Sequence, residues 1–215
     1  MAILPLALYL KHAHLSGMNK TGNTKSNKED LVGKLLIAMP SMGDPRFGKS
    51  VVYICAHTTD GAMGLIINKP TPDLKFKDLL EQLSIPSQAG GGIDDGRPIF
   101  FGGPVETARG FVLHTSDYKI EEMTLAVTRG FCMTATRDIL ADMAKGQGPD
   151  QAILALGYAG WGPGQLEAEL QQNGWLVAEG ARDLVFSEDN SGKWTAALQT
   201  LGIDPSLLSL EGGRA

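Results

Sequence analysis

Cysteine is scarce in this chain, which has only Cys55 and Cys132 among its 215 residues. Two cysteines cannot form the disulfide framework that stabilises many small secreted domains, and they cannot supply a cysteine-based zinc site. We therefore expect both to be reduced thiols in the core of a cytoplasmic protein.

The chain also lacks an excess of positive charge. Nineteen Lys and Arg residues face 24 Asp and Glu residues, which gives a net charge of -5. Residues 1–30 hold four of the lysines and two of the acidic residues, so the remainder carries a net charge of -7. Dedicated nucleic-acid-binding domains neutralise phosphates with clustered Lys and Arg side chains. This charge balance argues against direct nucleic-acid binding.

No apolar run is long enough to span a membrane. The first ten residues, MAILPLALYL, fall well short of the roughly 20 apolar residues that a membrane-spanning helix needs. They also contain Pro5 and lack a preceding basic segment, so they do not match a signal peptide. We expect neither export nor a membrane anchor.

Residues 18–30, MNKTGNTKSNKED, are polar and are typical of a solvated lead-in. We expect residues 1–30 to form a flexible extension, and Met18 is a plausible start of the natural chain, which would remove residues 1–17. Residues 31–215 are expected to form one domain.

Signatures of common enzyme classes are missing as well. The sequence contains no GxSxG, HExxH or CxxC motif, so we expect no metal site and no cofactor. Residues 43–50, GDPRFGKS, do match the P-loop pattern GxxxxGK[ST]. A P-loop requires a helix after it, with the helix N-terminus facing the phosphates, whereas VVYICA at 51–56 favours a strand. We therefore predict a strand-to-strand connection here instead of a nucleotide site.

Hydrophobic periodicity predicts many short strands and a few short helices. The predicted strands cover residues 31–39, 50–58, 63–69, 97–105, 110–116, 123–128, 151–160, 175–180 and 183–188. The predicted helices cover residues 76–83, 134–145 with Thr134 as N-cap, 165–172 and 194–201, and residues 88–96 are a predicted flexible loop. The second and third strands should form a hairpin. Hairpins mixed with isolated helices indicate an α+β domain on mixed β-structure.

Three loops have compositions that suit a binding surface. The loop PSMGDPRF at 40–47 holds Asp44 and Arg46, which can pair with each other or be presented to a ligand or partner. The second loop is the GGP turn, at 102–105, and the third is the segment GYAGWGPGQLE at 157–167, whose four glycines let the backbone approach another group closely. This third segment is either a tight packing turn, with Trp161 as a core or lid aromatic, or an anion or ligand site at a helix start.

The histidines offer a weaker alternative. His57 is expected on the same strand face as Tyr53 and Cys55. A cluster of His57, His114 and a carboxylate such as Asp44 or Asp60 could act as a base or bind a metal. The competing interpretation is that each histidine is a hydrogen-bonded sheet residue.

Six ordered blocks of the sequence resemble the AlgH/YqgE family of bacterial proteins. They are LLIAMPSMGDPRF (35–47), SVVYICAH (50–57), DGAMGLIINKP (60–70), GGPV with RGFVLH (102–105 and 109–114), LGYAGWGPGQLEAEL (156–170) and NGWL (173–176). The resemblance implies a cytoplasmic protein with one α+β domain, in which mixed, partly barrel-like β-structure is flanked by short helices. The family is associated with regulation of alginate synthesis and its members are often labelled transcriptional regulators, so the resemblance implies a regulatory role and carries over no catalytic residues.

Two hypotheses follow. The leading one is a non-enzymatic regulatory or interaction protein that acts through a protein partner or a small ligand. The alternative is a ligand-binding domain or an enzyme of unknown reaction, with Asp44, Arg46, His57, Asn68 and His114 around a pocket near the glycine-rich turns. For either, the candidate surface consists of Pro40, Met42, Asp44, Arg46, Phe47, His57, Asn68, Gly102, Gly103, Pro104, His114, Gly160, Trp161, Gly162, Gly164 and Gln165.

Overall fold

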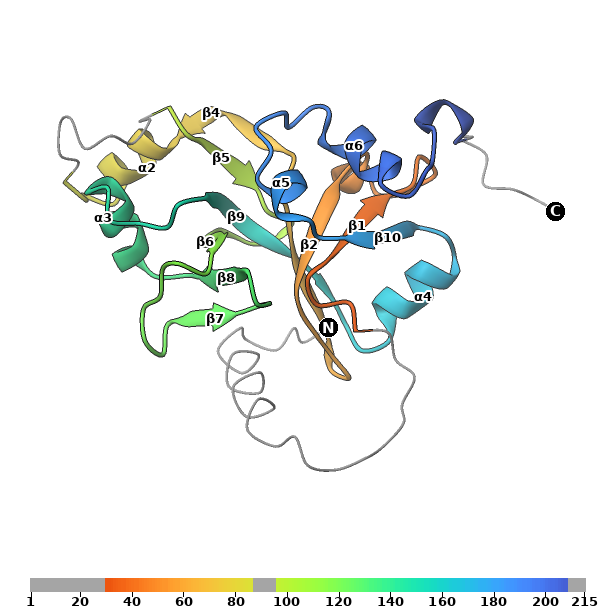
Figure 1. Cartoon of the computed structure of the whole chain (residues 1–215), viewed down its shortest axis with the longest axis horizontal. Helices are drawn as coiled ribbons and strands as arrows, with labels where there is room; N and C mark the ends of the chain where they lie inside the picture. Colours follow the sequence, from red (N-terminus) through yellow and green to blue (C-terminus); the bar gives the residue numbers. More distant parts are fainter. Residues whose placement is uncertain (1–29, 87–95, 209–215) are drawn as a thin grey trace.

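A computed structural model describes residues 30–86 and 96–208 of the chain (Figure 1). The expected N-terminal extension and nearly all of the predicted loop at 88–96 lie outside the described residues. Within the described ranges the chain forms ten strands and five short α-helices, which confirms the α+β prediction. None of the described helices is long and apolar enough to cross a lipid bilayer.

The elements follow one another in the order below. The strands are β1 (Lys34–Ala38), β2 (Val51–Thr58), β3 (Gly61–Ile66), β4 (Pro70–Lys75), β5 (Pro98–Phe101), β6 (Val105–Thr115), β7 (Thr124–Ala126), β8 (Phe131–Thr134), β9 (Ala152–Trp161) and β10 (Trp175–Glu179). The helices are α2 (Phe76–Gln82), α3 (Arg137–Ala144), α4 (Gln165–Gln171), α5 (Arg182–Val185) and α6 (Lys193–Gln199), with 3-10 turns η1 (Pro45–Phe47) and η2 (Pro205–Leu207).

Strand β9 joins the two halves of the sheet. The antiparallel strand order is β10-β1-β2-β3-β9-β6-β8-β7, and β5 pairs with β9 in parallel while β4 pairs with β5. Residues 154–156 of β9 lie between β5 and β6, whereas residues 159–161 pair with β3. The predicted hairpin of the second and third strands is present as β2 and β3.

Both faces of the sheet are buried, because successive residues of the central strands point to opposite faces and are nearly all buried. Leu35 and Tyr53 pack on the face covered by α5 and α6, and Leu36 and Val52 pack on the opposite face, against the α4 residue Leu166. A third cluster fills the other end of the sheet beneath α2 and α3, which Figure 1 shows side by side at the end farthest from α4. The core therefore consists of three clusters, and Gln165, Ala168 and Gln171 of α4 stay exposed to solvent.

The GGP turn is a backbone contact with β9. The amide of Gly102 donates to the carbonyl of Leu156 at 2.8 Å, and the carbonyl of Gly102 accepts from the amide of Ile66 at 2.9 Å. A Cβ atom on Gly103 would lie 2.1 Å from the carbonyl carbon of Tyr158, and one on Gly157, whose φ is +71°, would lie 2.4 Å from the carbonyl oxygen of Gly103. Glycine is required here because the two backbones touch.

Two predicted elements are wrong. Residues 183–188 are not a strand, because Leu184, Val185 and Phe186 all pack on one core cluster from the helical turn α5 instead of alternating between faces. Thr134 is not a helix cap, because it is the buried last residue of β8, and α3 begins after Thr136.

Strands β4 and β8 were not predicted. Prolines 70 and 72 weaken the strand pattern of β4, which tolerates them as an edge strand paired only with β5. Strand β8 has only four residues, and its last residue, Thr134, was predicted to begin a helix, so the sequence pattern did not indicate a strand there.

Lys193 is a charged side chain in the core. It is 1% exposed, and its Nζ donates to the carbonyls of Ile67 and Val185 at 2.9 Å each. The carbonyl of Val185 lies in the last turn of α5, where helical carbonyls lack partners. Lys193 thereby ties α5 and α6 to the sheet, and desolvation by burial lowers its pKa to about 8.

The burial of Lys193 predicts that its own contribution to stability rises in alkali. An unfolded lysine has a pKa of about 10.4, so between pH 8 and that value Lys193 binds a proton in the unfolded chain and not in the native chain, and its contribution to the free energy of unfolding increases with pH. We expect the difference in unfolding free energy between the natural chain and Lys193→Met to increase across this window by at most about 3 kcal/mol. Urea denaturation at a series of pH values measures it, and two parallel pH curves would contradict the prediction.

Candidate functional site

A cavity of about 520 Å³ opens between α4, the loop that follows β1, and the end of β9. We call it the aromatic cleft. Eight of the sixteen residues of the candidate surface line it, namely Met42, Asp44, Arg46, Phe47, Pro104, Gly160, Trp161 and Gln165. It is completed by Ser41, Gly43, Val105, Glu169, Gln172, Gly174 and Trp175.

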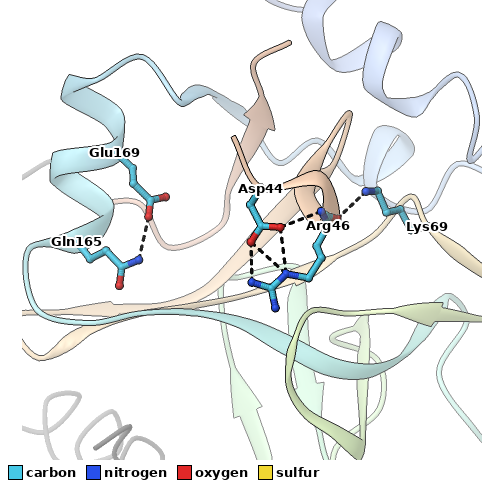
Figure 2. Close-up of polar contacts among 5 residues, drawn as sticks. All are labelled: Asp44, Arg46, Lys69, Gln165 and Glu169. Atoms are coloured by element: carbon cyan, nitrogen blue, oxygen red, sulfur yellow. Dashed lines mark hydrogen bonds and ion pairs between the residues drawn. The ribbon is translucent and has the colours of Figure 1, made fainter. Parts of the chain in front are cut away.

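Asp44 and Arg46 form one wall of the aromatic cleft as a closed ion pair. Nη2 of Arg46 lies 2.6 Å from Oδ2 of Asp44, and Nε of Arg46 donates to the same carboxylate at 3.0 Å. The Asp44 carboxylate also accepts from the amide of Arg46 at 2.9 Å and so caps η1. These hydrogen bonds from Arg46 lower the pKa of the Asp44 carboxyl. The predicted pairing of the two side chains is confirmed (Figure 2).

Lys69 anchors the backbone of this wall. Its Nζ donates to the backbone carbonyl of Arg46 at 2.7 Å, as Figure 2 shows. The contact fixes the backbone of η1 and leaves the Arg46 guanidinium to Asp44.

Glu169 forms the opposite wall, and its carboxylate is bound by three N–H donors. Oε2 accepts from the indole Nε1 of Trp161 at 2.9 Å and from the indole Nε1 of Trp175 at 2.8 Å. Oε1 accepts from Nε2 of Gln165, one helical turn earlier on α4, at 2.9 Å. Gln165 in turn accepts from the amide of Gly162 at 3.0 Å. One carboxylate therefore links the end of β9, the start of β10 and α4.

Three aromatic rings line the cleft beside this carboxylate. The rings of Trp161 and Trp175 meet edge to face with centroids 5.9 Å apart, and the rings of Phe47 and Trp175 do so at 5.6 Å. Trp161 and Trp175 are almost fully buried, whereas Phe47 is half-buried. Trp161 is thus a core aromatic that also contributes to the cleft wall.

His57 does not lie where the strand pattern predicts. A β-bulge between Ile54 and Ala56 inserts one residue, so His57 leaves the face of Tyr53 and Cys55. Its Nε2 instead lies 3.3 Å from Oε1 of Glu167 on α4. The expected shared face is therefore wrong, and the bulge is the physical reason.

His114 is a fully buried sheet residue. Its Nδ1 lies 2.8 Å from the carbonyl oxygen of Thr115, which can only accept, so Nδ1 carries the proton. Nε2 then accepts from Oγ1 of Thr134 at 2.9 Å, and Thr134 accepts from Oγ1 of Thr124 at 2.8 Å. Burial lowers the pKa of His114 and favours this neutral form. The interpretation of His114 as a hydrogen-bonded sheet residue is confirmed.

Asn68 and Pro40 line a different cavity, together with Lys49 and the start of α6. The Asn68 side chain accepts from the amide of Val51 at 2.8 Å and donates to the carbonyl of Lys49 at 2.9 Å, so it fixes the start of β2. Since β2 follows η1 directly, residues 43–50 have the predicted strand-to-strand geometry and no P-loop helix.

Four of the remaining candidates are glycines that act through their backbone conformation or backbone contacts. Gly102 and Gly103 contact β9, Gly162 donates to Gln165, and Gly164 begins α4 with a φ of +71°. The five polar residues of the enzyme hypothesis thus lie in four separate places, with only Asp44 and Arg46 together. Among the described residues no group of three or more His, Cys, Asp or Glu side chains is arranged to hold a metal ion.

Sequence reasoning missed Glu169 and Trp175. Glu169 lies four residues after Gln165 on a predicted helix, and Trp175 follows the Asn-Gly turn that ends it, so both were within reach of a periodicity argument. The hydrogen bond between Glu169 and Trp175 could not be predicted from periodicity, because it depends on the pairing of β10 with β1.

A family model described as AlgH-like matches residues 35–206 of the chain. The chain belongs to the AlgH-like family. A UPF0301 protein of Cereibacter sphaeroides is 59% identical over 186 residues, covering 86% of this chain and all of the relative, and one of Nitrobacter hamburgensis is 50% identical over 207 residues, covering 93% and 96%.

Solved structures agree with this assignment. The solution structure of the AlgH protein from Pseudomonas aeruginosa matches this AlgH-like chain with a TM-score of 0.71 and 39% identity, covering 90% of this chain and all of that one. A crystal structure of a Corynebacterium diphtheriae protein matches with a TM-score of 0.64 at 18% identity, covering 81% and 89%, and shows the shared fold alone.

The buried neutral His114 predicts a loss of stability in acid. Because its native pKa lies below the ordinary value of 6.5, the unfolded chain binds a proton that the native chain excludes once the pH falls below about 6.5. The free energy of unfolding of the AlgH-like protein should therefore decrease below that pH more steeply than that of the non-titrating variant His114→Gln. Urea denaturation between pH 7.5 and 5 measures the difference, and equal slopes would refute it.

Proposed function

We propose that this AlgH-like protein is a non-enzymatic interaction protein that holds a protein partner or a small ligand in the aromatic cleft. The observation that carries the proposal is the convergence of the DPRF loop, the GGP turn, the end of β9 and α4 on one cavity of about 520 Å³. Cavities of this size that combine aromatic side chains with placed polar groups are typical binding sites. The regulatory part of the proposal rests on the resemblance to the AlgH/YqgE family.

The polar groups of the cleft support binding over catalysis. A general acid or base must be able to exchange a proton with a substrate at hydrogen-bond distance. The Asp44 carboxylate is instead paired with Arg46, and two indoles and an amide fill three of the roughly four acceptor positions of the Glu169 carboxylate. Both carboxylates therefore shape the cleft, and Glu169 gives it a negative charge.

The charge of the chain supports a protein or small-molecule ligand over a nucleic acid. The cleft carries two carboxylates and one guanidinium, and residues 31–215 carry a net charge of -7. Phosphate backbones require several clustered cations.

Filling the cleft should abolish binding. A Cβ atom on Gly43 would meet nothing within 4 Å, and the residue has an ordinary φ, so the backbone accepts a side chain here and Gly43→Trp adds an indole at the cleft wall. A ligand at 100 times its dissociation constant stabilises a protein by about 2.7 kcal/mol, which raises its melting temperature by a few degrees. We expect ligands that stabilise the natural chain in a thermal-shift screen, and proteins that co-purify with it, to be lost from Gly43→Trp.

Gly130→Trp is the matched control, because Gly130 is equally open, has an ordinary φ and lies in the turn before β8, away from the lining of the cleft. It should retain every ligand and partner. Full retention by Gly43→Trp as well would place the binding surface elsewhere.

A further inference from the structure

We infer that the aromatic cleft selects a primary alkylammonium group, such as a lysine side chain or a free amine, through Oε1 of Glu169. This inference rests on the proposed function, because it names the ligand chemistry of the same cleft. It follows from the hydrogen bonds and charges of the two walls.

The acceptor sites of Glu169 are nearly, but not completely, occupied. A carboxylate has two oxygens with about four acceptor positions in total. The two indole N–H groups fill both positions on Oε2, and Gln165 fills one on Oε1. One acceptor position on Oε1 is left, on a half-buried residue that lines the cleft. A ligand N–H can fill that position without displacing a structural contact.

The balance of charge gives this position its preference for a cation. Asp44 and Arg46 neutralise each other, whereas no Lys, Arg or His in the described part of the chain forms an ion pair with Glu169. All three of its partners are neutral donors. The cleft therefore keeps one uncompensated negative charge beside the rings of Phe47, Trp161 and Trp175, and aromatic rings also attract cations.

The single free position favours an ammonium over a guanidinium. Bidentate binding of a guanidinium requires a free position on both carboxylate oxygens, and Oε2 has none. An ammonium is a compact point charge that can donate one N–H to Oε1 and place its alkyl chain along the aromatic rings of the cleft. The geometry thus distinguishes lysine-like from arginine-like ligands.

Indole resonances provide a direct test. The chain has three tryptophans, of which Trp161 and Trp175 donate to Glu169, whereas Trp194 donates to the carbonyl of Ala38 and serves as an internal control. We propose to titrate the full chain at pH 7 with n-butylammonium and to record the indole N–H peaks by NMR. The peaks of Trp161 and Trp175 should move together and reach saturation while that of Trp194 stays fixed. Butanol and butylguanidinium should each bind roughly tenfold more weakly, and butyrate should not compete.

Two variants change the charge of the cleft in opposite directions. Glu169→Gln should weaken n-butylammonium binding about tenfold and leave butanol binding nearly unchanged. Arg46→Gln removes an exposed cation, keeps the backbone contact of Lys69, and should strengthen n-butylammonium binding by roughly twofold to fivefold. The second variant keeps the inference testable if the loss of indole contacts unfolds the first.

A further arm separates the two sources of the ammonium group. Nα-acetyl-lysine methylamide should bind at least as tightly as n-butylammonium if the cleft accommodates a lysine of a partner, and more weakly if it accommodates a free amine. Both results support ammonium selection.

Other outcomes overturn the inference. No movement of the two indole peaks with any probe, equal binding of butanol, tighter binding of butylguanidinium or butyrate, or no gain with Arg46→Gln would each exclude ammonium selection by Glu169. Those results would leave the proposed function intact as long as Gly43→Trp still abolishes binding of the natural ligand. Retention of that ligand by Gly43→Trp would contradict the proposed function instead.

Discussion

The contact between the GGP turn and β9 is the constraint on which the rest of the structure depends. Because Gly102, Gly103 and Gly157 carry no side chains, two backbone segments pack directly on each other, and β9 can pair with β5 and β6 in one half and with β3 in the other. Any larger residue would force these backbones apart. Trp161, at the end of β9, and Pro104, directly after the turn, are positioned by this contact, and both line the aromatic cleft.

The Glu169 carboxylate then fixes α4 to the ends of the strands that form the cleft. A half-buried carboxylate is costly to desolvate unless N–H donors compensate it, and hydrogen bonds to a charged group contribute about 1.5–3 kcal/mol each. Two indoles and one amide supply them, from β9, β10 and α4. The same three hydrogen bonds hold this wall of the cleft and dock α4 on the sheet. A substitution that removes the charge of Glu169 therefore also weakens the contacts that shape the cleft.

Local chemistry explains which parts could be predicted from the sequence. The β-branched run of β2 and the apolar run of β9 predict their strands, and the short separation of Asp44 and Arg46 predicts their ion pair. The position of His57 could not be predicted, because one inserted residue in β2 reverses the side on which it emerges. Glu169 could not be paired with Trp175 for a different reason: the contact arises from the return of β10 beside β1, which periodicity does not encode.

The ionisable groups of the core and those of the cleft differ in their surroundings and in their hydrogen-bond partners. In the core, burial lowers the pKa of His114 and of Lys193, and both nitrogen bases are fixed by backbone or hydroxyl partners. In the cleft, hydrogen bonds from Arg46 lower the pKa of the Asp44 carboxyl, and the Glu169 carboxylate accepts from two indoles and an amide. A group held firmly in one protonation state is poorly suited to proton transfer and well suited to presenting a fixed charge. The contacts that stabilise this cleft therefore support the proposal that it recognises a ligand of opposite charge.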